Sequence, residues 1–345
     1  MEKLNSYSLT FGKEPFNMIS RLSETDEICK SFLAEVPPQQ VYMLTGVRGA
    51  GKTVQMTELS NRISRENNWE TVELNPSTDL LQDMASKLYS LKGNRDIFKN
   101  AKFDLSFWGI GVQVTGMPQI TNAEVAITEM LETLKKHKKR LLITIDEATN
   151  SDSMKAFASA FQIFLRKELP VYLLMTGLYE NIDALQNNKS HTFLHRAPKI
   201  FLGALNIGSI ARNYKKMFDL TDEQAREMAS MTKGYSFAFQ VLGYWTYENG
   251  GDYKKAMDKY LEYLEEYSYK KIWSELSFKE KSILEVVSRV EDGKVAEIRD
   301  RLNMKPNEFS PYRERLIKRG ILLGDDRGIV KIALPFFEEY VLNNV

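Results

Sequence analysis

Gly46-Val47-Arg48-Gly49-Ala50-Gly51-Lys52-Thr53 reads G-x-x-x-x-G-K-T, a pattern that holds phosphate groups. Residues 41–45 before it are an apolar run rich in β-formers, which predicts a buried strand. Residues 53–65 after it have helical periodicity. Glycines let the backbone curl so that successive N–H groups point into one concavity, and the helix N-terminus adds partial positive charge there. The order strand, loop, helix therefore predicts a phosphate-binding loop.

The loop pattern assigns roles to individual residues. Lys52 is expected to reach the β- and γ-phosphates of a nucleotide, and the Thr53 hydroxyl is expected to ligate Mg²⁺. We therefore expect ATP and Mg²⁺ as cofactors. The residues expected to bind the nucleotide are Gly46, Val47, Arg48, Gly49, Ala50, Gly51, Lys52, Thr53 and Val54.

A second pattern lies at residues 141–148, where an apolar strand ends in Asp146-Glu147. A buried parallel strand delivers its last side chains to the carboxyl edge of the sheet, where phosphates bind. Asp146 is expected to hold Mg²⁺, and Glu147 is expected to polarise the attacking water. The acidic pair favours hydrolysis over phosphoryl transfer to a second substrate. The sequence thus predicts an ATPase with a slow turnover.

Length and composition set broad limits. The chain has 345 residues, enough for two or three domains, and its 43% hydrophobic content suits globular cores. A net charge of +1 gives no argument for or against nucleic acid. The single cysteine, Cys29, excludes a disulfide framework, and three scattered histidines do not suggest a metal cluster. Without a signal peptide or a long apolar run, we expect a cytoplasmic protein with no membrane association.

Two further strand ends carry candidate residues. Thr176 ends an expected buried strand over residues 170–177; it either orients the attacking water or simply precedes the turn at Gly177. Arg196 lies just before an expected strand over residues 199–202. It either acts on the γ-phosphate of a neighbouring subunit, which implies a homo-oligomer, or makes a surface salt bridge.

Residues 1–205 form the expected ATPase core, with one insertion. Alternating apolar residues around glycines predict a β-hairpin at residues 101–116. Phe107 and Trp108 in it either contact a partner or nucleic acid or, as we favour, cover the core. The basic run at residues 135–140 is either a binding patch or, as we favour, the complement of a helix C-terminus.

The remaining chain changes character twice. Residues 206–268 show helix after helix with no strand pattern, which predicts a helical lid. Its expected helices cover residues 209–218, 221–232, 236–248 and 252–266. Residues 269–345 show three helices and then two short strands, which predicts a winged helix-turn-helix. Those elements are expected at residues 277–290, 295–302, 307–319, 321–323 and 329–333.

The winged helix suggests contact with double-stranded DNA, because its third helix is locally basic. Winged helices also serve as protein-interaction modules, so a protein partner is the alternative. The expected DNA contacts are Arg313, Arg315, Lys318 and Arg319 on the third helix and Arg327 at the tip of the wing.

With these motifs placed, nearly the whole chain resembles AAA+/STAND-type P-loop ATPases of the prokaryotic archaeal-ATPase-like group. The origin-recognition and Cdc6 initiators share the same three-part order. The resemblance implies an α/β fold: a five-stranded parallel sheet of order 5-1-4-3-2 with helices on both faces. It also implies that the segment before the first strand, including Arg21, packs on the adenine; plain packing on the sheet is the alternative.

One segment departs from the resemblance. The lid helix of this group usually begins with G-x-P, or with a motif carrying a nucleotide-sensing arginine. Here the matching residues 233–240 carry Ser236 in place of the proline, and no arginine follows nearby. The sequence therefore leaves nucleotide sensing by the lid unassigned.

Three functions follow from these observations. The first is an ATP-hydrolysing switch coupled to DNA binding through the winged helix. The second is a signalling or scaffold ATPase, in which nucleotide gates self-association and the winged helix binds protein. The third is a helper ATPase of a mobile element or defence system, for which no residue is specific.

Overall fold

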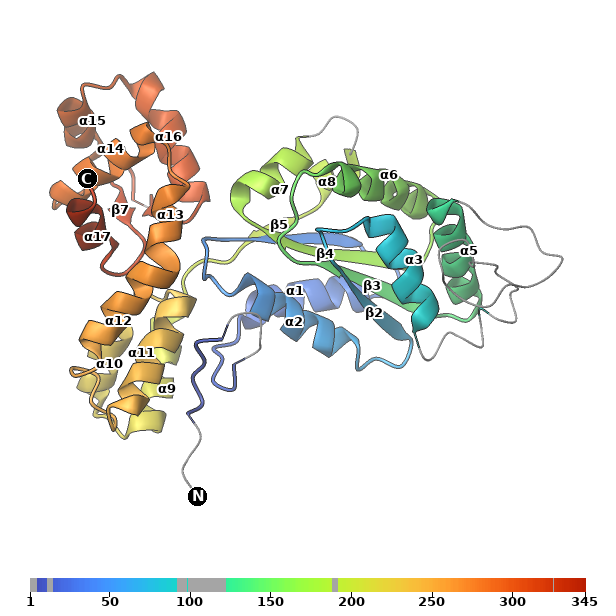
Figure 1. Cartoon of the computed structure of the whole chain (residues 1–345), viewed down its shortest axis with the longest axis horizontal. Helices are drawn as coiled ribbons and strands as arrows, with labels where there is room; N and C mark the ends of the chain where they lie inside the picture. Colours follow the sequence, from blue (N-terminus) through green and yellow to red (C-terminus); the bar gives the residue numbers. More distant parts are fainter. Residues whose placement is uncertain (1–4, 11–14, 92–97, 99–121, 188–191, 325) are drawn as a thin grey trace. The chain divides into compact units, whose positions relative to one another are not determined.

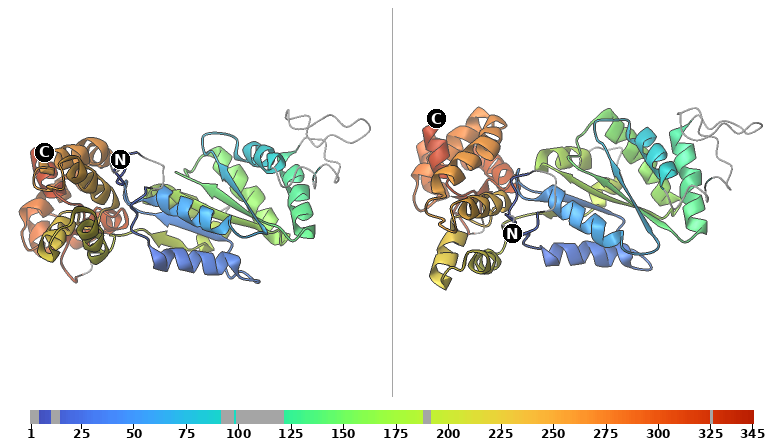
Figure 2. Two further views of the ribbon diagram at one scale, coloured as in Figure 1. Left: turned by 90° about the horizontal axis from the view of Figure 1, so that it is seen from below. Right: turned by 60° about the horizontal axis from the view of Figure 1, so that its bottom comes forward.

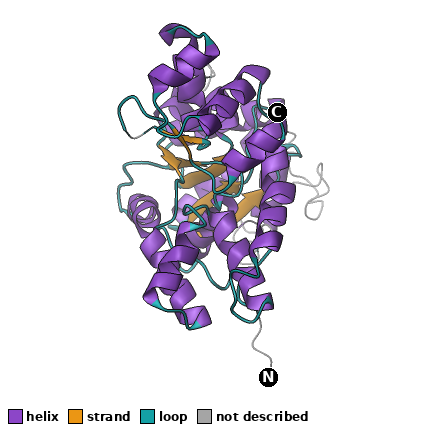
Figure 3. Cartoon of the chain, turned by 90° about the vertical axis from the view of Figure 1, so that its left-hand side faces the viewer, coloured by secondary structure: helices purple, strands orange, loops and turns teal. Residues whose placement is uncertain are grey.

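A computed structural model describes residues 5–10, 15–91, 98, 122–187, 192–324 and 326–345. Contacts divide the chain into two compact units. The sheet unit comprises Leu22–Thr45 and Gln55–Ile200, and the helical unit comprises Met1–Arg21, Gly46–Val54 and Phe201–Val345. Helices make up most of the regular structure (Figure 3). The hairpin expected at residues 101–116, with Phe107 and Trp108, lies outside the described residues.

A five-stranded parallel sheet forms the centre of the sheet unit (Figure 1). Its order is β2-β3-β4-β1-β5, which confirms the predicted order read from the other edge. Each strand lies close to its expected position. The strands are β1 (Val41–Thr45), β2 (Trp69–Leu74), β3 (Arg140–Ile145), β4 (Val171–Gly177) and β5 (Lys199–Phe201).

Register makes the two faces of the sheet distinct. Val41, Leu173, Ile143 and Val72 lie opposite one another across four strands, so their side chains share one face. They belong to one core cluster with the helices of that face. Those helices are α3 (Leu80–Ser90), α5 (Ala123–Lys136), α6 (Asp152–Arg166) and α7 (Tyr179–Gln186), with α8 (Thr192–Arg196) following α7.

The alternate strand residues face the other two helices, α1 (Leu22–Leu33) and α2 (Lys52–Ile63). Phe32 of α1 contacts the rings of Tyr42, Trp69 and Tyr172. Both views of Figure 2 show α1 and α2 running side by side, and Gln55 of α2 donates to Thr25 of α1 at 2.6 Å. The sheet is therefore covered on both faces, as its apolar strands require.

The helical unit has a core of its own. Its first part contains α9 (Ile207–Phe218), α10 (Asp222–Ser230) and α11 (Ser236–Glu248). A capping box of Thr221 and Gln224 opens α10. The expected last lid helix instead begins at Met257 and continues without a break. It consists of α12 (Met257–Leu264), the π-helical turn η2 (Glu265–Tyr269) and α13 (Lys270–Ser274).

The C-terminal elements follow in the expected order. Three helices precede an antiparallel pair of short strands, and a helix that was not predicted ends the chain. They are α14 (Phe278–Arg289), α15 (Val295–Leu302), α16 (Pro306–Lys318), β6 (Leu322–Leu323), β7 (Lys331–Ile332) and α17 (Phe337–Asn343). Among the described helices, none is both long and apolar enough to cross a membrane.

Candidate functional site

The predicted phosphate-binding loop, residues 46–53, lies at the start of α2, and residues 46–54 belong to the helical unit. Gly49 and Gly51 have φ of +78° and +86°, values at which residues with a side chain are strained. The loop turns there, and α2 begins at Lys52. The Nζ of Lys52 donates to the carbonyl oxygens of Gly46 and Val47, at 3.0 Å each. The lysine thus lies against the loop that it follows.

Three successive loop carbonyls are bonded to the start of α11. The Tyr235 hydroxyl donates to the Arg48 oxygen at 2.6 Å, and the Phe237 N–H donates to the Gly49 oxygen at 3.1 Å. The Ser236 hydroxyl donates to the Ala50 oxygen at 3.0 Å. A proline at this position would supply no such donor. The serine that departs from the G-x-P pattern therefore has a defined role in this chain.

Arg21 reinforces the same contact. Its guanidinium is buried and donates to the oxygens of Ala50 at 3.2 Å, Gly203 at 2.8 Å and Ser236 at 3.3 Å. Arg21 therefore ties the segment before β1 to the phosphate-binding loop. Its contact with a bound nucleotide stays a prediction.

The acidic pair lies at the end of β3, within the sheet unit. The Thr176 hydroxyl, fully buried in β4, donates to a carboxylate oxygen of Asp146. The Glu147 N–H donates to Asp146 Oδ1 at 3.0 Å and to Thr176 Oγ1 at 3.2 Å. Thr176 therefore orients the expected magnesium ligand, a contact that neither sequence interpretation of this threonine had proposed.

Glu147 itself has a left-handed backbone. Its φ is +52°, and its side chain is exposed. This conformation is uncommon for a residue other than glycine, asparagine or aspartate, and strain of this kind is concentrated at functional sites. The two hydrogen bonds to its N–H hold the turn in place.

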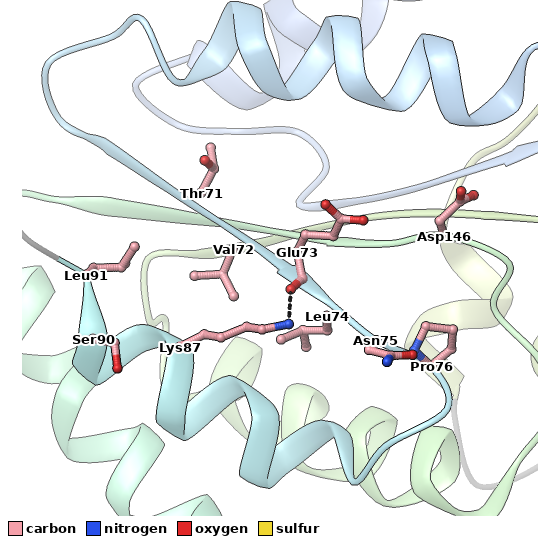
Figure 4. A pocket seen from close by; sticks show the side chains of 10 residues that line it. All are labelled: Thr71, Val72, Glu73, Leu74, Asn75, Pro76, Lys87, Ser90, Leu91 and Asp146. Atoms are coloured by element: carbon pink, nitrogen blue, oxygen red, sulfur yellow. Dashed lines mark hydrogen bonds between the residues drawn. The ribbon is translucent and has the colours of Figure 1, made fainter. Parts of the chain in front are cut away.

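A hollow of about 670 Å³ opens beside Asp146 (Figure 4). Most of its wall comes from β2, the residues that follow it, and the end of α3. The Lys87 side chain lines it. Its amine donates to the backbone carbonyl oxygen of Glu73 at 2.8 Å and to Asp83 Oδ2 at 2.9 Å. The lining residues are Thr71, Val72, Glu73, Leu74, Asn75, Pro76, Lys87, Ser90, Leu91 and Asp146.

Arg196 is the last residue of α8 and is exposed, and β5 begins three positions later at Lys199. This position leaves it accessible to another subunit. Its role towards a neighbour's phosphate stays a prediction.

The expected DNA-contacting cations differ in their surroundings. Arg315 donates to the buried carboxylate of Glu280 at 2.8 Å, and Arg319 lies 3.6 Å from the same carboxylate. Lys318 pairs with Glu314 one turn earlier on α16. The Arg313 Nε is buried and has no hydrogen-bond partner in the described part of the chain. Arg327 is exposed between β6 and β7.

Glu280 gives a stability prediction with a defined pH dependence. Burial alone would raise the pKa of its carboxyl, but hydrogen bonds from Ser277 and Arg315 outweigh that effect and lower the pKa below 4.5. A group whose pKa is lower in the folded state than in the unfolded state stabilises the fold at pH values above the unfolded pKa. This stabilisation is lost as the pH falls through the folded pKa. Glu280→Gln should therefore lower the free energy of unfolding by about 1–3 kcal/mol at pH 7. The difference from wild type should shrink below pH 4.5, as urea denaturation at several pH values would measure.

A matched control for this prediction is Glu285→Gln on the same helix. Glu285 pairs with the exposed Arg289 at 3.1 Å, and such a surface pair contributes about 0–1 kcal/mol. Equal losses from both variants, or a loss from Glu280→Gln that did not depend on pH, would contradict the assignment.

Comparison with solved structures shows which folds are similar. A Walker-type ATPase of Pyrococcus abyssi matches with a TM-score of 0.65 and 17% sequence identity, covering 94% of this chain and 96% of that chain. The ORC2 protein of Aeropyrum pernix, in its ADPNP-ADP complexes, matches with a TM-score of 0.59 and 15% identity, covering 97% and 96%. These matches confirm the predicted P-loop ATPase type of fold.

Sequence comparison identifies one domain family, over the C-terminal part of the chain. Residues 266–341 match a family described as a domain of unknown function, DUF8462. A search of curated proteins finds no match. The matched region begins in the π-helical turn η2, includes every element from α13 to β7, and ends within α17.

Proposed function

We propose that this protein binds Mg-ATP and hydrolyses it. The observation that carries the proposal is a complete G-x-x-x-x-G-K-T loop in a chain whose buried strand β3 is followed at once by Asp146-Glu147. In this proposal the loop N–H groups and Lys52 bind the phosphates. The fold similarity to a Walker-type ATPase supports the proposal, because the match covers 94% of this chain.

The residues present fit a magnesium ion. Carboxylate and hydroxyl oxygens are the ligands that Mg²⁺ prefers, and Asp146 and Thr53 supply one of each. The Thr176 hydroxyl donates to Asp146 and so orients the proposed carboxylate ligand. When bound, Mg²⁺ neutralises charge on the phosphate oxygens. In the proposed reaction Glu147 then accepts the proton of the attacking water.

The test is steady-state ATP hydrolysis by the purified protein with Mg²⁺ and with excess chelator. Turnover that requires Mg²⁺ supports the proposal. Absence of both turnover and ATP binding would overturn it. Asp146→Asn serves as a second test, since it removes the charge of the proposed magnesium ligand and keeps the shape of the side chain.

Lys52→Ala should weaken ATP binding by roughly 10- to 100-fold, because a hydrogen bond to a charged group contributes about 1.5–3 kcal/mol. Calorimetric titration with a non-hydrolysable analogue would measure this. Lys87→Ala is the matched control: its amine also donates to a backbone carbonyl, but outside the loop. Equal affinity of the Lys52→Ala variant and wild type would exclude the phosphate-binding role.

The partner of the C-terminal region is a second question. We propose DNA coupling as the first candidate, supported by three helices followed by a two-stranded ribbon and by basic residues on α16. Pairing of Arg315, Lys318 and Arg319 with Glu280 and Glu314 favours the other candidate, a protein partner, because these cations already have acidic neighbours.

Salt dependence separates the two candidates. Affinity for DNA should fall steeply with the logarithm of salt concentration, whereas binding to a protein need not. Stimulation of ATP hydrolysis by duplex DNA at low salt would support DNA coupling. Hydrolysis with no response to DNA, and no DNA binding, would leave the ATPase and favour the protein-binding alternative.

A further inference from the structure

We propose that Tyr235 is a positioning residue for the phosphate-binding loop and that it couples the nucleotide state of that loop to the helix of residues 257–274. This inference rests on the proposed function, whose site it extends. Arg48 is the residue at which the loop and the helix meet. Nothing in the G-x-x-x-x-G-K-T pattern specifies Arg48, because it occupies a variable position.

The hydroxyl of Tyr235 joins two parts of the chain. It lies 2.6 Å from the Arg48 carbonyl oxygen and 2.7 Å from the Ser268 Oγ. The side chains of Tyr235 and Ser268 are both buried. A phenol has one hydrogen to donate, and a carbonyl can only accept. Tyr235 therefore donates to Arg48, and Ser268 donates to Tyr235. In this geometry each of the three groups has a hydrogen-bond partner.

Burial keeps the phenol in the form that this chain of hydrogen bonds needs. It raises the pKa of Tyr235, an effect larger than the opposing ones of the Ser268 hydrogen bond and the Arg48 charge. The hydroxyl therefore remains a donor throughout the neutral pH range.

A second link joins the same loop residue to the same helix. The Arg48 guanidinium lies 3.2 Å from a carboxylate oxygen of Glu275, immediately after α13. Ser268 and Glu275 are about two helical turns apart, so the helix presents both on one side. The backbone and the side chain of Arg48 thus contact two points along it.

The contact point on the helix is itself irregular. Ser268 belongs to the π-helical turn η2, between α12 and α13. Such turns occur often at functional sites, where they mark a place at which a helix changes its register. The π-helical turn therefore lets the helix adjust its backbone locally when Ser268 moves.

The carbonyl contacts also bear on phosphate binding. In a trans peptide the C=O of one residue and the N–H of the next point in opposite directions. Holding the oxygens of Arg48, Gly49 and Ala50 on the α11 side therefore turns the following N–H groups away from α11. A loop fixed in this way has less conformational freedom to lose when phosphate binds.

Tyr235→Phe removes one hydroxyl and keeps the ring. We expect the affinity for a Mg²⁺-bound non-hydrolysable ATP analogue to fall about tenfold, because the Arg48 carbonyl and the Ser268 hydroxyl lose their partner. In wild type, the analogue should also change the hydrogen–deuterium exchange of residues 265–275. That response should be lost in Tyr235→Phe at saturating analogue, and in Ser268→Ala as well.

Tyr260→Phe is the matched control. The Tyr260 hydroxyl is also buried and donates to a backbone carbonyl, that of Met231, at 2.9 Å, but it does not contact the loop. This variant should lose stability to urea about as Tyr235→Phe does, yet keep both the affinity and the exchange response. A purely structural role of Tyr235 would make the two variants equal in all three measurements.

The outcomes are distinct. Analogue binding with wild-type affinity and a wild-type exchange response in Tyr235→Phe would overturn the inference and leave the proposed ATP binding intact. Failure of wild type to bind the analogue would overturn both. Loss of affinity and of the exchange response in Tyr235→Phe, with neither lost in Tyr260→Phe, is the result that supports the inference.

Discussion

Glu147→Gln should reduce ATP turnover by about 10³-fold while leaving ATP affinity close to that of wild type. A positioned general base contributes about 10²–10⁴-fold, and glutamine cannot accept the proton of the attacking water. The amide has nearly the same shape as the carboxylate. Single-turnover hydrolysis gives the rate of the chemical step, and titration with a non-hydrolysable analogue gives the affinity.

The local geometry explains why the substitution should leave the fold intact. The backbone N–H of Glu147 donates the bonds that hold it, to Asp146 and Thr176, and its own side chain is exposed. Replacing the carboxylate with an amide keeps those bonds. The substitution also adds no backbone strain, because the φ of +52° at this position is disfavoured for glutamate and glutamine alike.

Glu168 provides a close control for this variant. It is exposed, has the same φ of +52°, and lies between α6 and β4, before the strand rather than after one. Glu168→Gln should hydrolyse ATP at the wild-type rate. If Glu147→Gln also did so, Glu147 would not be the base, and the water-activating group would have to be sought elsewhere.

The sequence predicted the sheet well because its signals are local. Short apolar runs that end in Gly46 or in Asp146-Glu147 define both the strands and their direction, and β1 to β4 fall within a residue or two of the expected bounds. The last lid helix was predicted over residues 252–266, but its bounds were wrong for the opposite reason, since it spans residues 257–274. No proline or glycine interrupts it, so only tertiary packing decides where the lid ends and the next region begins.

The sequence predicted the motifs of the candidate site but not the hydrogen bonds that hold the loop in place. The bond between Tyr235 and Arg48 joins residues 187 positions apart, and no periodicity encodes such a contact. The departure at Ser236 was visible in the sequence, but its meaning required the geometry, in which the hydroxyl bonds a loop carbonyl. Similarly, the sequence predicted Arg315 and Arg319 as DNA contacts, whereas in the structure both lie beside the carboxylate of Glu280.

Gly49→Ala should destabilise the helical unit by roughly 2–6 kcal/mol, the sum of about 1–3 for backbone strain and about 1–3 for overpacking. At the φ of +78° a side chain is strained, and an added Cβ would lie 2.2 Å from the Tyr235 hydroxyl oxygen and 3.0 Å from the Phe237 Cβ. The ring cannot turn aside freely, because it is buried and bonded at its hydroxyl. Urea denaturation measures the loss.

Gly328→Ala separates the two contributions. Gly328 has a φ of +77°, nearly that of Gly49, but no atom lies within 4 Å of the position of an added Cβ. It should therefore show only the backbone strain. The excess loss in Gly49→Ala is the part due to the contact with α11.

The excess should also depend on Tyr235. Without its hydroxyl, the nearest ring atom to the added Cβ is the Cζ at 2.9 Å instead of the oxygen at 2.2 Å. Gly49→Ala should therefore cost less in a Tyr235→Phe background than in wild type, because residues in contact are not additive. Additive losses in this double-mutant cycle would mean that the loop and α11 are not packed against each other in solution, and the positioning role of Tyr235 would fail with that contact.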